Sequence, residues 1–481
     1  MLRKYLPLVL ALALASGLSA CAANTPPTST PTATPTLTPT AIPPTPARTP
    51  AEKTLASVDS SWIKESITIS ADERHIAYAL NGSSGQTVML DGQQVSRYPG
   101  VAGLTFSPDG KRLAYIAAVD GKQAVVVDGQ AGKPYDSVGA GTLLFSPDSK
   151  RLAYVATQGG KQLVVVDGQE GKAYDAIGKG MLAFSPDSRH LAYAVKTGNQ
   201  ALVVVDGQEG KAYDAISQGS LLFSPDSAHV AYWASAGKQQ FVILDGQEQK
   251  HYDGILSGTL TFSPDSSRVA YVAAQGGKHQ VVVGQQESQA YEAISEGPHF
   301  SPDGKRVAFV AIAGDKQFAV VDGQEGKQYN AIGYLTFSPD SAHLAYGAVA
   351  GQKQLVVLDG KEQKQYDGIG AGTILFSPDS RHLAYGAALG DRQFIVVDGR
   401  EQPKFDGISE GSLIFSPSSA WVAYIVTIGD KQAVAVDGRP GKLFDLIISG
   451  NGPGVIADSA ASLHYLALAG NDVHLVEEQV K

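Results

Sequence analysis

Residues 106–115 read Phe-Ser-Pro-Asp-Gly-Lys-Arg-Leu-Ala-Tyr, and close variants of this stretch recur along most of the chain. The Phe-Ser-Pro-Asp anchor begins at Phe106, Phe145, Phe184, Phe223, Phe262, Phe300, Phe337 and Phe376. A ninth copy, from Phe415, carries Ser418 in place of the aspartate, and degenerate copies begin at Ile69 and Ile456. The eleven anchors lie 37 to 41 residues apart, and nine residues after each one stands a tyrosine or phenylalanine. Such a period is typical of repeat architectures, in which every copy forms one structural unit.

The copy at residues 141–177 predicts four short strands. Residues 142–145, 152–156, 162–166 and 173–177 are rich in apolar and β-branched side chains, with turn residues between them. No segment of the copy has helical periodicity. The third segment contains three consecutive valines, so it is apolar on both faces, as in sheets that are packed between neighbouring sheets.

The pattern predicts an all-β fold, a β-propeller of about eleven four-stranded blades of about 39 residues each. One large closed ring is favoured because no linker divides the repeats, and two smaller propellers or a β-solenoid are the alternatives. The last copy lacks a fourth strand. We expect residues 57–63 to supply it and thereby to close the ring, which would remove both exposed sheet edges.

The repeated run, as at residues 106–115 and 300–309, resembles the WD-repeat-like propeller repeat of TolB-type bacterial proteins. The resemblance covers about residues 57–481 and implies a propeller that is exported and binds other molecules without catalysis. The chain departs from that family in its number of repeats, since TolB-type proteins have six blades. It also shows no separate N-terminal α/β domain, so a role in a Tol complex is not implied.

The N-terminal region predicts export and anchoring. Residues 1–20 have a basic start, an apolar run and small residues before Cys21, the single cysteine of the chain. Leu-Ser-Ala-Cys resembles a bacterial lipoprotein signal, which implies lipidation of Cys21 and attachment to the cell membrane or envelope, with the choice of membrane left open. The alternative is an ordinary signal peptide with an incidental cysteine. Residues 21–56 form a Pro/Thr-rich linker, and its residues 25–50 span up to about 80 Å as polyproline II. Residues 57–481 form the propeller.

Composition excludes several classes of function. The net charge of −9 disfavours nucleic-acid binding, and one cysteine excludes an intramolecular disulfide framework. No catalytic motif is present, and no cofactor or metal site is expected. The repeated Asp-Gly is interpreted as turn chemistry because calcium needs six to eight oxygens. The sequence therefore predicts a non-catalytic scaffold that binds an extracytoplasmic protein or an anionic ligand. The alternative is a hydrolase or lyase acting on carbohydrate or a lactone, with Glu296 and Glu410 in the channel.

Two groups of residues are candidates for binding. The first is a rim of cations in the loop between the second and third strands: Lys122, Lys161, Lys238, Lys278, Lys316, Lys353, Arg392 and Lys431. A ring of positive charge on an anionic body suits an anionic partner, whereas solvation of the rim is the simpler explanation. The second group departs from the repeat pattern: Trp233, His299 and Tyr334, together with Pro298 and Trp421.

Overall fold

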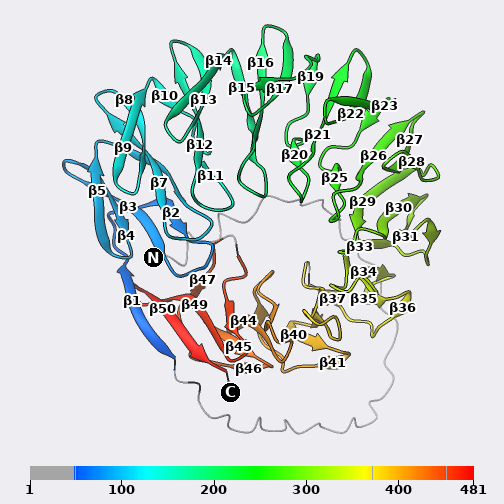
Figure 1. The fold of residues 1–481 in the computed structure, drawn as a ribbon. Helices are drawn as coiled ribbons and strands as arrows, with labels where there is room; N and C mark the ends of the chain where they lie inside the picture. Colours follow the sequence, from blue (N-terminus) through cyan, green and yellow to red (C-terminus); the bar gives the residue numbers. More distant parts are fainter. Residues whose placement is uncertain (1–47, 49, 371, 451, 481) are drawn as a thin grey trace, which may run out of the picture. The chain divides into compact units, whose positions relative to one another are not determined.

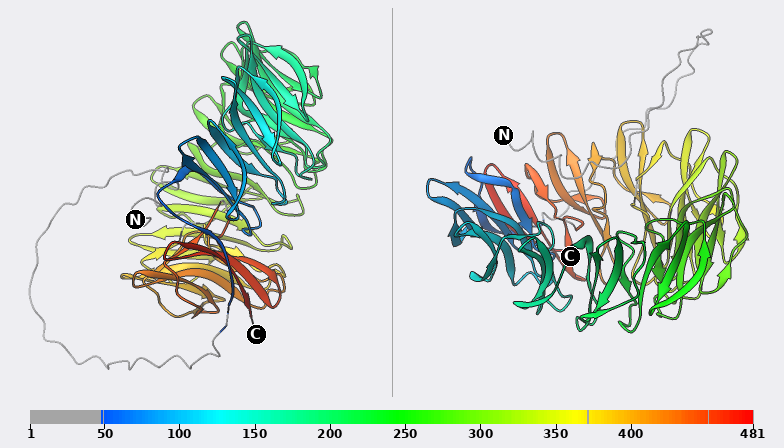
Figure 2. Two further views of the ribbon diagram at one scale, coloured as in Figure 1. Left: turned by 90° about the vertical axis from the view of Figure 1, so that its left-hand side faces the viewer. Right: turned by 90° about the horizontal axis from the view of Figure 1, so that it is seen from above.

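The computed structural model describes residue 48 and residues 50–480 apart from 371 and 451. The predicted signal at 1–20, the lipidation site Cys21 and most of the predicted linker lie outside the described residues. The described part is all-β: eleven sheets follow one another in a single ring, an eleven-bladed propeller (Figures 1 and 2). The predicted fold class is confirmed, and the single ring replaces the alternative of two smaller propellers.

Each blade contains four antiparallel strand positions, and blades are numbered here in chain order. The innermost position is one strand in five blades: β2 (Trp62–Ile69), β6 (Val101–Phe106), β15 (Ala176–Phe184), β29 (Ala293–Phe300) and β33 (Ala331–Phe337). It is split in the other six: β10 (Ser137–Val138) and β11 (Leu144–Phe145), β19 (Ala215–Ile216) and β20 (Leu222–Phe223), β24 (Gly254–Ile255) and β25 (Thr261–Phe262), β37 (Gly368–Ile369) and β38 (Leu375–Phe376), β42 (Gly407–Ile408) and β43 (Ile414–Phe415), β47 (Leu446–Ile448) and β48 (Ile456–Ser459).

The second strands carry the repeated aromatic residue and are β3 (Ile76–Gly82), β7 (Leu113–Val119), β12 (Leu152–Gln158), β16 (Leu191–Thr197), β21 (Val230–Ala236), β26 (Val269–Gln275), β30 (Val307–Ala313), β34 (Leu344–Ala350), β39 (Leu383–Leu389), β44 (Val422–Ile428) and β49 (Ser462–Ala469). The third strands are β4 (Gly85–Leu90), β8 (Lys122–Val127), β13 (Lys161–Val166), β17 (Gln200–Val205), β22 (Gln239–Leu244), β27 (Lys278–Val283), β31 (Lys316–Val321), β35 (Lys353–Leu358), β40 (Arg392–Val397), β45 (Lys431–Val436) and β50 (Asp472–Gln479).

The outer strands are β5 (Gln93–Tyr98), β9 (Gln130–Tyr135), β14 (Gln169–Tyr174), β18 (Gln208–Glu209), β23 (Gln247–Tyr252), β28 (Gln286–Glu287), β32 (Gln324–Glu325), β36 (Lys361–Glu362), β41 (Arg400–Glu401), β46 (Arg439–Pro440) and β1 (Ala51–Ser57). The last of these comes from the start of the described chain and completes blade 11 by pairing with β50 (Figure 1). The expectation that the N-terminal side closes the ring is therefore confirmed. The position was wrong: residues 51–57 close it, and Trp62 already belongs to blade 1.

The predicted fourth strand of the repeat is also displaced. The turn between the third and outer strands is only Asp167-Gly168, with both residues at positive φ, so β14 begins directly at Gln169. Ile177 belongs to the next blade, and its N–H donates back to Oε1 of Gln162 on β13 at 2.7 Å. The predicted strand at 173–177 thus joins the end of one blade to the start of the next.

The core consists of separate clusters, most of them at the interface between two neighbouring blades. All eleven repeated aromatic residues of the second strands are buried there, which is why every copy needs a ring at that position. Because both faces of the middle strands are covered, their apolar residues do not alternate with polar ones.

Candidate functional site

The predicted cationic rim lies at the start of the third strands, where most of its side chains form ion pairs. Lys161 and Lys353 lie 2.5 Å from Asp175 and Asp367, and Lys122 and Lys431 lie 3.3 Å from Asp136 and Asp445. Arg392 pairs with Asp406 in the same way.

The aspartates of these pairs also hold the next blade. Asp175 Oδ2 accepts the N–H of Gly198, in the turn of blade 4, at 2.7 Å. The bond from Lys161 and then that N–H keep the pKa of Asp175 below its ordinary value of 3.8, so the carboxylate stays charged. Five of the eight rim cations thus lie in ion pairs with an aspartate, which leaves less free positive charge than the predicted open ring.

Three members of the rim depart from this arrangement. Lys238 lies in the turn itself, one position before the others. Lys278 stands at the usual position, but Glu292 replaces the aspartate and accepts the N–H of Gly314. Lys316 contacts the neighbouring Asp315 at 3.3 Å, because Asn330 stands where most blades have aspartate.

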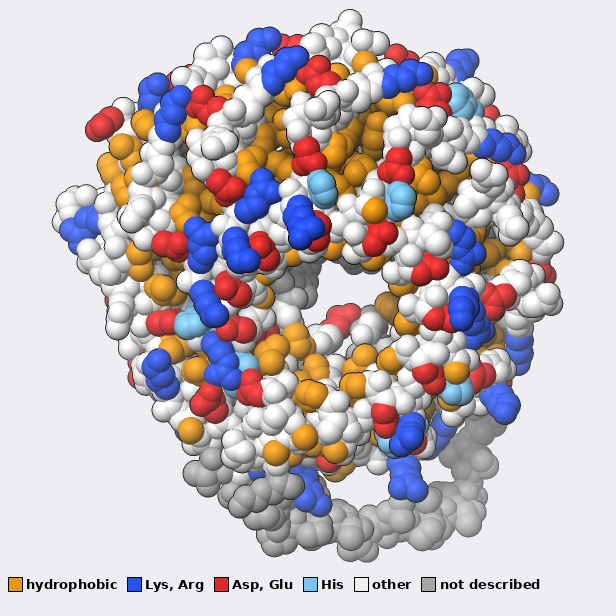
Figure 3. Space-filling view, viewed as in Figure 1, with side chains coloured by type: hydrophobic (Ala, Val, Ile, Leu, Met, Phe, Trp, Pro, Cys, Tyr) orange, Lys and Arg blue, Asp and Glu red, His pale blue; other side chains and the backbone are white. Residues whose placement is uncertain are grey.

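The opposite ends of the strands contain the Ser-Pro-Asp turns, which join each blade to the next. In blade 3, Ser146 Oγ donates to Asp148 Oδ1 at 2.6 Å, and the Asp148 N–H donates to Ser188 Oγ of blade 4 at 2.9 Å. Arg151 extends to the same neighbour, where it donates to the carbonyl of Arg189 at 2.9 Å. The anchor residues are thus occupied by contacts between blades. Figure 3 shows that side chains of both charges surround the central opening on one face of the molecule.

The repeated Asp-Gly serves as a turn, as the sequence predicted. Asp167 has a φ of 52° and accepts the N–H of Leu152 at 2.9 Å, while its other oxygen lies 3.2 Å from Arg151. His190, His229, His343 and His382 replace this arginine in their blades and contact the equivalent aspartates at 2.6–2.7 Å. Among the described residues, no group of three or more His, Cys, Asp or Glu is placed to hold a metal ion.

Two of the candidates that depart from the repeat, His299 and Tyr334, come together around Glu296. The carboxylate of Glu296 in β29 accepts the N–H groups of Tyr334 and Leu335 in β33, each at 2.9 Å. His299 Nε2 lies 3.3 Å from Glu296 Oε1. Burial raises the pKa of Glu296, but the contacts with His299 and the two N–H groups outweigh burial and hold the pKa below its ordinary value of 4.5.

This geometry makes Glu296 a structural anion. Its two oxygens are engaged by backbone donors, whereas a general acid needs a raised pKa. Glu410, its supposed partner in a hydrolase, is exposed in blade 10, three blades away. The described residues thus bring no acid pair together at Glu296.

The two tryptophans occupy packing positions. Trp233 lies on β21 and packs against the cluster shared by blades 5 and 6. Trp421 takes the place of the histidine or arginine after the ninth anchor, and its indole N–H donates to the carbonyl of Ala460 in blade 11 at 2.7 Å. Pro298 lies in β29 beside His299.

The closing seam between blades 11 and 1 has side chains of its own, which the repeat pattern did not reveal. Buried His464 lies 2.8 Å from Asp458 and bonds the carbonyl of Asp72 at 2.6 Å. Arg74 reaches both Asp458, at 2.8 Å, and Glu477, at 2.6 Å. The sequence contained a signal for this seam, because these residues stand in the first and last copies of the repeat, which are degenerate and which the closed ring brings together.

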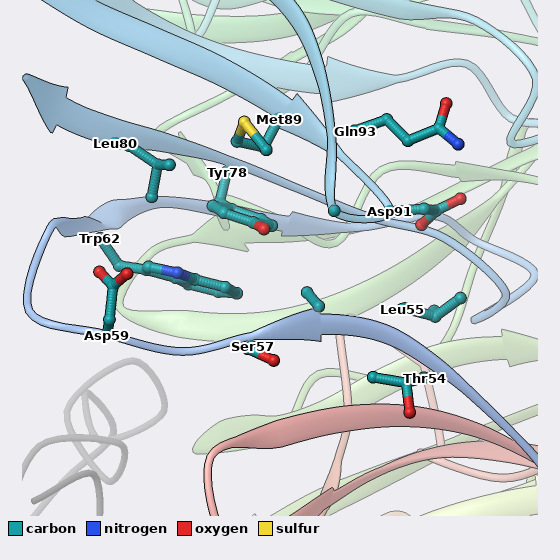
Figure 4. Close-up of a pocket in the computed structure, with 12 residues that line it drawn as sticks. Thr54, Leu55, Ser57, Asp59, Trp62, Tyr78, Leu80, Met89, Asp91 and Gln93 are labelled. Atoms are coloured by element: carbon teal, nitrogen blue, oxygen red, sulfur yellow. The ribbon is translucent and has the colours of Figure 1, made fainter.

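A cavity of about 440 Å³ opens at this seam, where Ala56 takes the place of the outer-strand aromatic residue (Figure 4). In blade 2, Tyr135 fills that place and packs edge-on against Tyr154 of blade 3. At the seam Trp62 stacks on Tyr78 instead, with ring centroids 3.5 Å apart. A second cavity of about 460 Å³ lies beside Tyr334, between blades 8 and 9.

Comparisons with known proteins give distant structural likenesses. No family model and no curated protein matches the chain. Solved structures that match include a eukaryotic initiation factor (13% identity, 71% of this chain and 96% of that chain, TM-score 0.40). TolB from Acinetobacter baumannii matches with 16% identity over 54% of this chain and 77% of that chain, with a TM-score of 0.23. The dihydro-heme d1 dehydrogenase NirN matches with 14% identity, 65% and 77% coverage and a TM-score of 0.28.

Among the described residues, no helix is long and apolar enough to cross a membrane. The described part of the chain is an eleven-bladed all-β propeller whose repeated polar side chains mainly connect blade to blade.

Proposed function

We propose that this protein is a membrane-anchored extracytoplasmic lipoprotein whose propeller acts as a non-catalytic scaffold for binding an extracytoplasmic protein or ligand. The observation that carries the proposal is that the polar residues of the repeat are engaged in contacts between blades. The serines, aspartates and arginines of the turns bond to neighbouring blades, and Glu296 is saturated by backbone N–H groups. Such a ring offers a large rigid surface with loops at its faces, which suits binding.

The anchor rests on the sequence at Cys21. Replacing it in Cys21→Ser removes the thiol that would receive the lipid, so the full chain should move from the membrane fraction to the soluble fraction. Ala23→Ser, two residues further on, is the control and should stay with the membrane. Unchanged membrane retention of Cys21→Ser would remove the anchor from the proposal.

The scaffold role is tested on intact cells. Chemical cross-linking of the anchored protein, followed by mass spectrometry, should recover the same partner or ligand in repeated experiments. A hydrolytic activity that disappears in the double variant Glu296→Gln, Glu410→Gln would overturn the non-catalytic role.

A further inference from the structure

Blade 8 lacks a side chain at a position where most other blades carry a bulky one. Ten residues after the anchor, blades 2, 3 and 5 have Ile116, Val155 and Trp233, which pack towards the following blade. Blade 8 has Gly347 there. The cavity of about 460 Å³ lies at this place, between blades 8 and 9.

Tyr334 lies beside the cavity in an unusual backbone conformation. Its φ is 63°, in the left-handed region that bulky residues avoid. Blade 2 has an inner strand of the same design, Val-Ala-Gly-Leu-Thr-Phe against Ile-Gly-Tyr-Leu-Thr-Phe in blade 8, and its Gly103 takes a φ of 64°. The propeller can therefore be built with glycine at this point, and the tyrosine is a strained choice that the fold does not require.

The tyrosine ring does not simply replace the missing side chain of Gly347. Its Cδ2 lies near the space above Gly347, 3.9 Å from where a Cβ would stand, yet 49% of the residue is exposed. It is the most exposed of the large hydrophobic residues among the described part of the chain. Aromatic side chains are common in the walls of ligand pockets, and the ring of Tyr334 is placed to form such a wall.

The walls of the cavity are mostly apolar, and Glu296 is the one charged side chain among the described residues that line it. Ile332, Val349 and Ile369 supply aliphatic surface. The two polar side chains are engaged: Gln354 Oε1 accepts the Ile369 N–H at 2.8 Å, and Glu296 holds the backbone of Tyr334 and Leu335. An anionic ligand would lose its hydration here and would face the carboxylate of Glu296, so the walls favour an uncharged apolar group over an anion.

From these contacts we propose that the cavity between blades 8 and 9 binds a small neutral molecule with an apolar ring, and that Tyr334 forms the wall against which the ring packs. The volume lies within the range of about 300–1,000 Å³ that is common for ligand sites. Glu296 is a positioning residue, because it accepts the N–H groups of Tyr334 and Leu335 in the strained turn that presents the ring. The proposal rests on the binding role proposed above and specifies its site.

The test uses the mature chain with Cys21→Ser and indole as the probe, followed by ligand-observed NMR titration. Gly347→Val restores a residue that blades 3, 6 and 7 carry at this position (Val155, Val272, Val310) and fills the cavity. A Cβ at 347 meets nothing nearer than 3.5 Å, so the variant should fold. Tyr334→Gly copies Gly103, relieves the strain and removes the ring wall.

We expect saturable indole binding to the parent chain and a Kd at least about tenfold higher in both variants. Leu443→Ala removes another exposed apolar side chain, in blade 10, and should bind indole as the parent does. Benzoate, the charged probe, should bind more weakly than indole. Circular dichroism confirms that each variant is folded.

The proposal is overturned if the parent chain shows no saturable indole binding, if either folded variant binds as tightly as the parent, or if benzoate binds as well as indole. These outcomes leave the scaffold role intact as long as cross-linking on cells still recovers a partner. If cross-linking recovers no partner while indole binds as expected, the scaffold role is contradicted and the proposed binding site in the cavity is still supported.

Discussion

Glu296 illustrates how a residue that suggests chemistry in the sequence becomes a structural one in the fold. A carboxylate in a loop that enters the innermost strand is a reasonable candidate for a catalytic acid. In the structure its oxygens accept hydrogen bonds from two backbone N–H groups, each at 2.9 Å. Those donors belong to the next blade, 38 and 39 residues further along the chain, so no local motif announces them. For the same reason, the sequence could not predict that Tyr334 would lie near Glu296 and His299.

The depressed pKa of Glu296 makes its contribution to stability dependent on pH. A carboxyl whose folded pKa lies below its unfolded value stabilises the fold above the unfolded pKa, about 4.5, and loses this effect as the pH falls through the folded pKa. Glu296→Gln should therefore lower the free energy of unfolding of its blade by about 1–3 kcal/mol at pH 7, because an N–H acceptor is lost.

Hydrogen exchange of the β33 amides measures this change across pH. The difference between parent and Glu296→Gln should shrink when the pH falls below 4.5. Glu410→Gln, an exposed change in a comparable loop of blade 10, should have little effect at any pH. A difference for Glu296→Gln that stays constant down to acid pH would contradict the assigned role.

At the scale of single strands, the sequence predicted the second and third strands well and the outer strands poorly. The second and third strands are marked by their own apolar residues, such as Val164-Val165-Val166. Outer strands such as Gln169–Tyr174 are mostly polar and exposed, so they look like loops until their pairing with the third strand is known. The strand Ala51–Ser57 carried no repeat anchor and followed a Pro/Thr-rich segment, which placed it in the predicted linker.

The pairing of β1 shows that it completes the repeat. Along the outer edge, a lysine of one blade contacts a glutamate of the next, as Lys172 contacts Glu209 at 2.7 Å. Lys442 of blade 10 makes the equivalent contact with Glu52 in β1, at 2.6 Å. The N-terminal strand therefore continues the outer edge of the ring with the same chemistry.

The buried residues of β1 should stabilise the closing blade. Leu55 is 4% exposed, and Leu55→Ala should lower the free energy of opening of blade 11 by about 2–5 kcal/mol through lost burial and the cavity left behind. Val95 on the outer strand β5 is 36% exposed, and Val95→Ala should change the free energy of opening of blade 11 by less than about 0.5 kcal/mol.

Hydrogen exchange of the β50 amides reports this opening directly, because those amides pair with β1. Equal protection of β50 in Leu55→Ala and in Val95→Ala would mean that β1 does not hold the seam.

At the scale of the whole molecule, the repeat predicted the number of blades but not where the ring ends. The bond from an aspartate N–H to a serine Oγ of the next blade, as from Asp148 to Ser188 and from Asp187 to Ser227, recurs at seven seams of the described ring, so these seams look alike. The choice between one ring and two depends on which blade receives the N-terminal strand. The seam residues answer this question. Arg74 of blade 1 contacts His464 of blade 11, and His464 bonds the carbonyl of Asp72 in blade 1, although about 390 residues of chain separate them.

The most direct test of the closed eleven-bladed ring is a disulfide across its seam. Thr54 of β1 lies opposite His474 of β50, with Thr54 Oγ1 and His474 Nδ1 3.2 Å apart. In a Cys21→Ser chain, Thr54→Cys with His474→Cys should form a disulfide within one chain, seen as a faster-moving monomer on a non-reducing gel and as a 54–474 linked peptide by mass spectrometry. Thr54→Cys with Gln208→Cys, from blade 4, should form none. Failure to link positions 54 and 474, or a link between two chains, would contradict the ring.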